Sequence, residues 1–508
     1  MRPDRRKLLI LLVVVGFIAV GALQSVIDPV QLKMVRAAQP NAGSKGREEL
    51  MVQLPGQFLV ASFAGFREVI AGALWIRADT FFHSGRYHAI IPIVRLVTWL
   101  DPHNIDVYTT GAWHLDYNFV DQGQMSDKRY IPASVALLKE GIANNPNIWD
   151  LYFELGWTHY SKKIMDYDQA VRYLELACRY DGIDPNTGRK IPRMAFVDHV
   201  LAHCYERVGR FADAEREWKK CRKRALEGLT KAGKSDPMND TTDLQVIDRN
   251  LGLMLLRLGW RYGDMKAYKE GLEIVKGRDG EPPLFAKWAV DGAEKDYARR
   301  VAANDPPRDA LKPLNTNFEV TWRKAGPKAI LIKGKINLVP ASEYKGLASE
   351  CFTQWYQDNV VKANADRRKY SQDGCRVFWR LEDYDYKLPD KDTFDFQIDT
   401  TKMVVWDSLY VAGGEFSQLI DLSDPRDAAM YPFKAKKYRL TVWWTPMDPT
   451  PDFIQDRVGW KGEAIVDSND CLRTDQMMSP AYGLRRSAWS KGFRILHKEW
   501  TIDREQLL

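Results

Sequence analysis

Hydrophobic residues are spaced in three different ways along the chain, and each spacing predicts a different kind of element. Residues 8–27 form an uncharged, mostly apolar run. From residue 57 to residue 300 apolar residues recur every three or four positions, as they do on one face of an α-helix. From residue 317 to residue 508 they alternate with polar residues in short runs, as they do in β-strands. The pattern therefore predicts an α+β multidomain protein.

The first run has the length and the flanking charges of a membrane anchor. A helix over this run, rising about 1.5 Å per residue, spans roughly the 30 Å hydrocarbon core of a bilayer. Arg and Lys residues precede the run, and a basic flank stays on the cytoplasmic side. We therefore predict that residues 1–27 form an N-terminal transmembrane helix. The protein would then be a single-pass inner (cytoplasmic) membrane protein whose bulk is exported to the periplasm or the cell exterior.

A cleaved signal peptide is the alternative, because small residues at Gly21 and Ala22 offer a cleavage site. The residues that follow, 28–56, combine Pro, Gly and Gln with mixed charge. We predict that they form a flexible tether between the membrane and the helical region.

In the helical region a block of residues recurs around a small residue. Leu74-x2-Arg77-Ala78-x2-Phe81 precedes Gly85-Arg86-Tyr87, and Leu201-Ala202-x2-Tyr205 precedes Gly209-Arg210-Phe211. Two further units match with substitutions around Gly111 and Gly156. Small residues at such positions let one helix approach its partner closely, and Asp-Pro or Asn-Pro dipeptides end the second helix.

These units resemble tetratricopeptide repeats, which are helix–turn–helix units of 34 residues. Insertions at 119–130 and 183–193 lengthen two of the units, and a degenerate fifth unit lies at 244–275. The first unit is also similar to the opening repeat of some exported, membrane-anchored bacterial repeat proteins. The resemblance implies that residues 57–300 fold as an α-solenoid of helical hairpins.

A Pro-rich linker is predicted at 301–316, followed by a β-rich, sandwich-like domain at 317–508. Its C-terminal sequence resembles no family that we identify. The strand candidates are 318–322, 330–338, 377–379, 394–398, 403–406 and 438–444, with a helix at 343–364.

Composition and motifs narrow the function classes. A net charge of +7, spread over 74 basic and 67 acidic residues, does not indicate nucleic-acid binding. Six cysteines are too few for a disulfide scaffold. Because the chain carries no phosphate-binding glycine loop, nucleophile elbow or His-Glu-x-x-His motif, we predict no enzyme activity, catalytic residue or cofactor. The pair His199 and His203 lacks a third ligand nearby, so we predict no metal site.

The candidate partner-binding residues lie on the first helix of three repeats. In repeats of this type the first helices line a concave groove, and counting from the small residues selects the side chains that line it. The alternative is that these side chains are covered and belong to the core. The predicted groove consists of Trp75, Asp79, Phe82, Phe153, Trp157, Tyr160, His199, His203 and Glu206.

We therefore predict a membrane-anchored scaffold that mediates protein–protein interaction in the cell envelope, with a protein or peptide as its ligand. The alternative is an envelope hydrolase or glycan-binding protein that acts through the β-rich domain. In that case Trp379, Trp406, Trp443 and Trp444 would supply faces for stacking on sugars.

Overall fold

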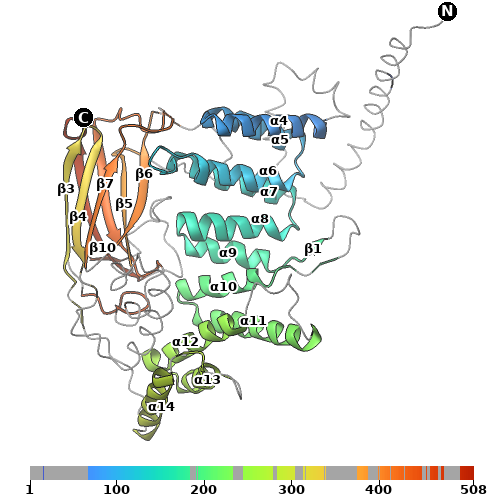
Figure 1. The fold of residues 1–508 in the computed structure, drawn as a ribbon, viewed down its shortest axis with the longest axis vertical. Helices are drawn as coiled ribbons and strands as arrows, with labels where there is room; N and C mark the ends of the chain where they lie inside the picture. Colours follow the sequence, from blue (N-terminus) through green and yellow to red (C-terminus); the bar gives the residue numbers. More distant parts are fainter. Residues whose placement is uncertain are drawn as a thin grey trace, which may run out of the picture. The chain divides into compact units, whose positions relative to one another are not determined.

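The computed structural model describes residue 15 and residues 67–508 of the chain, apart from several stretches (Figure 1). These stretches are 184–189, 192, 233–243, 278–282, 286, 304–312, 315, 337, 339–374, 387–398, 400, 412–413, 428, 449–453, 455–457, 467–470 and 474–491. Helices come first and antiparallel sheets follow, so the predicted α+β class is confirmed. The chain divides into two compact units, one of Met1–His114 with Leu137–Pro146 and one of Leu115–Ala136 with Asn147–Leu508.

The predicted membrane anchor and tether lie outside the described residues, except for Val15. Within the described part of the chain, no helix has both the length and the apolar content needed to cross a membrane.

The first unit contains α4 (Arg67–His83), a short 3-10 turn η2 (Tyr87–Ala89), α5 (Ile90–Leu100) and α6 (Ile105–Trp113). The second half of α7 (Ile131–Asn144) completes it. Gly111 of α6 allows a close approach, because a Cβ there would lie 3.1 Å from Leu137 and 3.3 Å from Val94. The small residue therefore packs one helix between two others.

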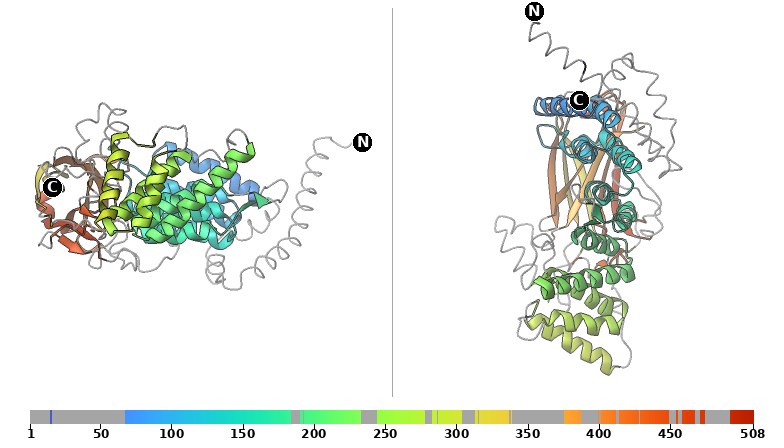
Figure 2. Two further views of the ribbon diagram at one scale, coloured as in Figure 1. Left: turned by 90° about the horizontal axis from the view of Figure 1, so that it is seen from below. Right: turned by 90° about the vertical axis from the view of Figure 1, so that its right-hand side faces the viewer.

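The second unit begins with the π-helical turn η3 (His114–Asn118) and the 3-10 turn η4 (Lys128–Tyr130), which precede the first half of α7. Three helical hairpins follow, which stack in Figure 2. Their members are α8 (Trp149–Phe153) continuing as η5 (Glu154–Ile164), α9 (Tyr167–Ala177), α10 (Phe196–Arg207), α11 (Phe211–Ala232), α12 (Leu244–Tyr262) and α13 (Met265–Val275). A small hairpin, β1 (Gly182–Ile183) and β2 (Lys190–Ile191), separates the first two, and α14 (Lys287–Ala302) follows the last.

The turn inside these hairpins has a common conformation. Met165, Gly209 and Gly263 each adopt a left-handed backbone with φ of 59°, 74° and 74°, a few residues before the second helix. The Asp264 side chain then caps α13 by accepting a hydrogen bond from the backbone N–H of Ala267. Asp166 caps α9 in the same way. These turns reverse the chain tightly, so that consecutive helices pack antiparallel.

The basic run of α11 joins neighbouring helices instead of forming a solvated face. Lys220 and Arg224 both bind the buried Asp198 of α10. Arg222 binds Asp248 of α12 at 2.6 Å. Sequence alone does not show that each neighbouring helix carries a carboxylate at the matching height.

The β-rich region consists of two antiparallel sheets. One has the order β3 (Phe318–Gly326), β4 (Ala329–Ile336), β7 (Glu415–Asp421). The other has the order β6 (Val404–Tyr410), β5 (Arg376–Asp383), β8 (Lys437–Trp444), β10 (Arg494–Asp503), β9 (Cys471–Arg473). A terminal turn, α17 (Arg504–Leu507), contacts β10 and β3.

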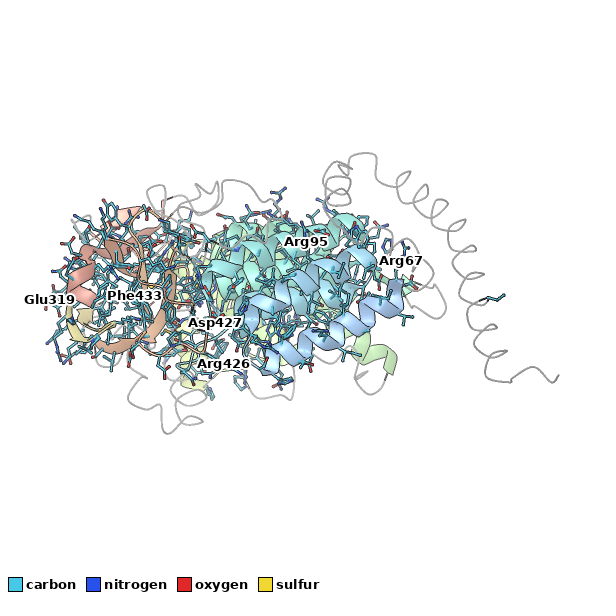
Figure 3. The ribbon with its side chains drawn as sticks, turned by 90° about the horizontal axis from the view of Figure 1, so that it is seen from above. Arg67, Arg95, Glu319, Arg426, Asp427 and Phe433 are labelled. Atoms are coloured by element: carbon cyan, nitrogen blue, oxygen red, sulfur yellow. The ribbon has the colours of Figure 1, made fainter. Side chains whose placement is uncertain are left out.

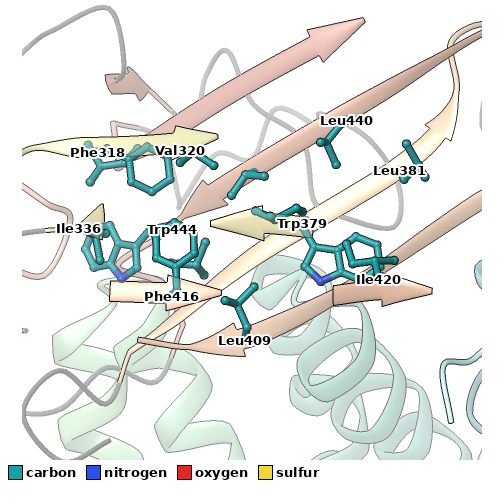
Figure 4. Close-up of a cluster of buried hydrophobic side chains, with 14 of the residues drawn as sticks. Phe318, Val320, Ile336, Trp379, Leu381, Leu409, Phe416, Ile420, Leu440 and Trp444 are labelled. Carbon is teal, nitrogen blue, oxygen red and sulfur yellow. The ribbon is translucent and has the colours of Figure 1, made fainter. Parts of the chain in front are cut away.

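The inward residues of both sheets form one hydrophobic core (Figure 4). Trp379 and Trp444 are fully buried there, and the Trp379 Nε1–H donates to Gln418 Oε1 across the two sheets at 2.8 Å. Leu314, within the predicted linker, also belongs to this core and pairs with Ile465. The strands β7, β9 and β10 were not predicted, while the candidates at 394–398 and 343–364 lie outside the described residues.

Helix approach at Gly156 can be tested by adding one methyl group. A Cβ at this position would lie 2.9 Å from Leu174 Cγ and 3.1 Å from the backbone nitrogen of the same residue. We expect Gly156→Ala to lower the free energy of unfolding by about 1–3 kcal/mol because the hairpin is overpacked. The midpoint of thermal unfolding, followed by circular dichroism, measures the effect.

Gly72→Ala is the matched control, because no atom lies within 4 Å of the added Cβ on α4. This substitution should leave the midpoint unchanged or raise it, since Ala favours a helix over Gly by up to about 1 kcal/mol. A Gly156→Ala protein as stable as the wild type would show that the two helices do not meet closely at this point.

Candidate functional site

In the second unit, the sheet region packs against the ends of the helical hairpins. The segment 119–130 provides the first contact: the Tyr431 hydroxyl donates to Asp121 Oδ2 at 3.1 Å, and Arg129 Nη1 donates to the Lys402 carbonyl at 3.3 Å. The Lys128 ammonium lies 4.3 Å from the centre of the Trp406 ring. The segment thereby covers β6, which is an edge strand of its sheet.

A second contact involves Trp460 and the turn between α10 and α11. The Trp460 Nε1–H donates to the backbone carbonyl of Glu206 at 2.6 Å, and its ring meets Phe211 at 4.7 Å between centroids. Arg257, near the end of α12, lies 5.4 Å from the same ring. The sheet region therefore occupies the side of the hairpins that carries the turns, and a partner must use another face.

The helix faces of the second unit carry a continuous row of half-buried aromatic residues, which we call the aromatic stripe: Trp149, Phe153, Trp157 and Phe196. Trp149 and Phe153 lie 5.9 Å apart, and Phe153 stacks on Trp157 at 6.4 Å. Phe196 of α10 meets Phe153 and Trp157 edge-on at 5.9 and 5.8 Å. The stripe thus joins the first helices of two successive hairpins.

Phe153 and Trp157 were predicted groove residues, and Trp149 and Phe196 were missed. Trp149 precedes Phe153 by four positions, so the same helical spacing contained its signal. Phe196 precedes His203 by seven positions and lies on the same face of α10. Only the structure shows that Phe196 of one hairpin lies against Phe153 and Trp157 of the other, so that they form one surface.

Beyond Phe196 the row becomes more deeply buried. His199 Nε2 and His203 Nε2 are 3.1 Å apart, so one ring donates and the other accepts. Both rings lie against Trp218, at 4.9 and 4.8 Å, and Trp218 itself is fully buried. The Trp218 Nε1–H donates to Glu206 Oε1. The structure therefore places His199, His203 and Glu206 together around a buried indole.

Burial keeps the histidine pair neutral. Burial, as the largest cause, together with the nearby His199 and Arg207, lowers the pKa of His203 from its ordinary 6.5 to about 3. Burial likewise lowers the pKa of His199. In the part of the chain that the structure describes, no group of three or more metal-binding side chains occurs, so the pair has no third ligand.

Tyr160 lies in the core, not on the groove surface that was predicted. It is 2% exposed and stacks on Tyr173 of α9 at 5.5 Å. Tyr160 follows Gly156 by four positions, and residues four apart share one face of a helix, so Tyr160 lies on the side that contacts α9 together with Gly156.

The remaining predicted residues belong to the first unit. Trp75 and Phe82 are half-buried and pack around the His114 ring at 6.4 and 4.6 Å. Asp79 is exposed and lies 3.4 Å from His83 on the same helix. Burial, as the largest effect, lowers the pKa of His114.

A buried polar cluster, which sequence analysis missed, joins η3, α7 and η5 beside the segment 119–130. His159 Nδ1 is 2.6 Å from Asp116 Oδ2 and 3.0 Å from Ser134 Oγ. In a catalytic triad the serine and the carboxylate bind different nitrogens of the histidine. Here both contact Nδ1, and all three residues are fully buried. This cluster therefore has the geometry of a structural contact.

Two lysines continue the cluster toward the sheet. Lys128 and Lys163 both donate to Ser126 Oγ, at 2.8 and 2.7 Å. Burial, with the charge of the neighbouring lysine, lowers the pKa of Lys128, and burial lowers that of Lys163. The cluster connects η5, the segment 119–130 and β6. Its buried polar groups destabilise the fold if they lose their partners.

The tryptophans of the β-rich region do not form an exposed sugar-binding row. Trp379 and Trp444 point into the core, while Trp443 stacks on Phe378 at 5.5 Å and Trp406 lies under Lys128. All four are less than a tenth exposed. Their faces are therefore unavailable for stacking on a glycan.

The depressed pKa of His203 gives a pH dependence of defined sign. Between about pH 3 and pH 6.5 the unfolded chain binds a proton at this histidine and the folded chain does not, so stability falls as the pH drops through this window. We expect the thermal midpoint of the wild type to fall more between about pH 7.5 and about pH 5 than that of His203→Gln. The exposed His88 serves as the control, and His88→Gln should keep the wild-type dependence. The same fall in all three proteins would show that His203 titrates normally.

Comparison with known proteins identifies no family. No family model matches the chain, and no curated protein matches it. Among solved structures, the crystal structure of MamA protein aligns with a TM-score of 0.26 and 16% sequence identity, over 44% of this chain and 100% of that chain. A likeness this low assigns neither a fold nor a function, and the helical hairpins rest on the packing described above.

Proposed function

We propose that this protein is a membrane-anchored scaffold of the tetratricopeptide-repeat type that binds a protein partner in the cell envelope through the aromatic stripe. The repeat assignment is supported by small residues at the helix contacts and by left-handed turns inside successive hairpins. Binding without covalent chemistry is supported by the geometry of the His159 cluster, which lacks the arrangement of a triad.

The observation that carries the proposal is the stripe itself. Large aromatic side chains that are partly exposed are the residues that most often supply binding energy in interfaces. The stripe lies on helix faces, whereas the sheet region takes the turns of the same hairpins. A partner can therefore reach the stripe without displacing the sheet region.

Charges beside the stripe indicate the chemistry of the partner. Asp150 and Glu154 each follow an aromatic residue of the stripe, Trp149 and Phe153. Burial is the largest cause that raises the pKa of Asp150, and the charge of Glu154 raises it as well. A basic side chain would relieve this repulsion between carboxylates. The Lys162 ammonium lies 4.3 Å from the centre of the Trp157 ring. The ligand proposed is thus a polypeptide segment with apolar side chains and an adjacent basic residue.

Replacing Trp157 tests the stripe. A partner identified by crosslinking the full chain in membranes would be titrated against the wild type and Trp157→Ala by calorimetry. We expect the Kd to rise about 30-fold, because truncating a hot-spot aromatic costs about 2 kcal/mol.

Trp113→Ala provides the matched control, because Trp113 is an exposed tryptophan, 45% accessible, on α6 outside the stripe. This variant should bind like the wild type. Both variants must keep the wild-type thermal midpoint, so that a loss of binding is not a loss of folding. Full affinity in a folded Trp157→Ala protein, repeated for Phe153→Ala, would refute binding at the stripe.

The location in the inner membrane, with the bulk of the chain exported, is part of the same proposal. It is supported by the uncharged run at 8–27 and the basic residues before it. We expect alkaline carbonate to leave the full chain in the membrane pellet, as it does for a spanning helix. Recovery of a soluble protein whose mature terminus follows Ala22 would instead establish a cleaved signal peptide.

A further inference from the structure

A cleft of about 500 Å³ lies between the second and third hairpins, where α11, α12 and α13 border it. The helices carry charged side chains over their outer surfaces (Figure 3), and such side chains also line this cleft. Volumes of roughly 300–1,000 Å³ are typical of sites for small ligands. The lining residues are Lys219, Arg222, Lys223, Leu226, Glu227, Leu251, Glu270, Glu273 and Ile274.

The helices on the two sides of the cleft contribute opposite charges. All three basic lining residues come from α11, and two carboxylates, Glu270 and Glu273, come from α13. Each of the three helices also contributes one apolar residue: Leu226, Leu251 and Ile274. A ligand that fits this lining therefore carries a negative group and a positive group on an apolar body.

Internal ion pairs neutralise part of the lining. The Lys219 ammonium lies 2.7 Å from a carboxylate oxygen of Glu270, so this pair joins α11 to α13 beside the cleft. The Lys223 ammonium and the Glu227 carboxylate are 3.9 Å apart and both side chains are mostly exposed, so water screens their attraction. Lys223 is therefore available to a ligand, whereas Lys219 is already paired.

Arg222 and Glu273 are the other charged groups that a ligand can bind. The Arg222 Nε–H donates to Oδ1 of the buried Asp248 at 2.6 Å, which holds the guanidinium in place. Its two Nη groups make no hydrogen bond to the described residues, and the Glu273 carboxylate has no hydrogen bond or ion pair with them either. A guanidinium fixed in this way presents a rigid pair of donors to a second carboxylate.

We propose that this cleft binds a short zwitterionic peptide with apolar side chains. The terminal carboxylate accepts hydrogen bonds from Arg222 and is attracted by Lys223, and the terminal ammonium pairs with Glu273. The apolar side chains pack on the apolar residues of the three helices. In a free amino acid one carbon carries both charged groups, whereas a peptide places an apolar body between them. The inference does not rest on the aromatic stripe, which lies on the first helices of the hairpins.

Saturation-transfer NMR on the purified full chain tests the inference, with the dipeptide Leu-Leu as the probe. We expect Leu-Leu to bind with a Kd of about 0.1–1 mM, as the usual efficiency of small ligands implies for its size. N-acetyl-Leu-Leu-amide has the same side chains and no charge. It should bind at least about tenfold more weakly, because it lacks both charge-assisted contacts.

Variants assign the binding to the cleft. Glu273→Gln and Lys223→Met each remove one charge from the lining, and each should raise the Kd about tenfold. Both residues are exposed, so neither change should alter the thermal midpoint. Lys266→Gln, at an exposed position of α13 outside the lining, is the matched control and should keep the wild-type Kd, as should Trp157→Ala in the stripe.

Three results would overturn the proposal. The absence of saturation transfer to Leu-Leu would show that the cleft binds no such peptide. Equal binding of the uncharged peptide would show that the lining does not recognise charge. A Kd that rises in Trp157→Ala but in neither Glu273→Gln nor Lys223→Met would place the probe on the stripe instead of in the cleft.

Discussion

The close approach of paired helices is the constraint on which the second unit depends. At Gly156 a Cβ would lie 3.2 Å from the Ala170 carbonyl, and at Gly271 it would lie 2.9 Å from the backbone nitrogen of Leu256. Backbones this near leave no room for a side chain, so each hairpin has one permitted packing. Left-handed turns at Met165, Gly209 and Gly263 close the hairpins in the same way. Identical closure is what places successive turns on one side and successive helix faces on another.

That separation of surfaces explains how one chain holds two kinds of domain together. The sheet region contacts the turns through Trp460 and through 119–130, and both contacts use buried or partly buried hydrogen bonds. A shift in the position of the sheet region would break these hydrogen bonds. The unpaired buried groups would then destabilise the fold by more than each hydrogen bond stabilises it. The hydrogen bonds therefore define a single docking position. The covered edge of β6 also removes a site at which foreign strands would pair.

Most of the helical hairpins could be predicted from the sequence, but little of the contact between the hairpins and the sheet region could be. Local sequence features predicted the helix contacts and turns. These features are the small residues Gly156 and Ala202 and the turn at Gly209-Arg210. The stripe was partly legible, because the spacing of Phe153 and Trp157 follows helical periodicity. Tyr160 was misplaced because it lies four positions after Gly156, on the same face of the helix, and so it packs on α9 with that glycine. Lys163, which donates to Ser126, and Glu206, which accepts from Trp460, lie far away in sequence from these partners. Strand β10 was missed because it interleaves His, Lys and Glu with apolar residues.

The π-helix η5 contributes residues to two surfaces. Trp157 points to the stripe, while His159 and Lys163 reach the buried cluster beneath 119–130. A regular α-helix repeats every 3.6 residues, and its faces are then set by that period alone. His159 and Lys163 are four positions apart and therefore share one face of the helix, while Tyr160 packs on Tyr173 of α9. A ligand on Trp157 would thus contact the helix that also carries Lys163, whose ammonium donates to Ser126 of the segment 119–130. Trp157 and Lys163 thus place the proposed binding surface and the contact with the sheet region on different faces of one helix.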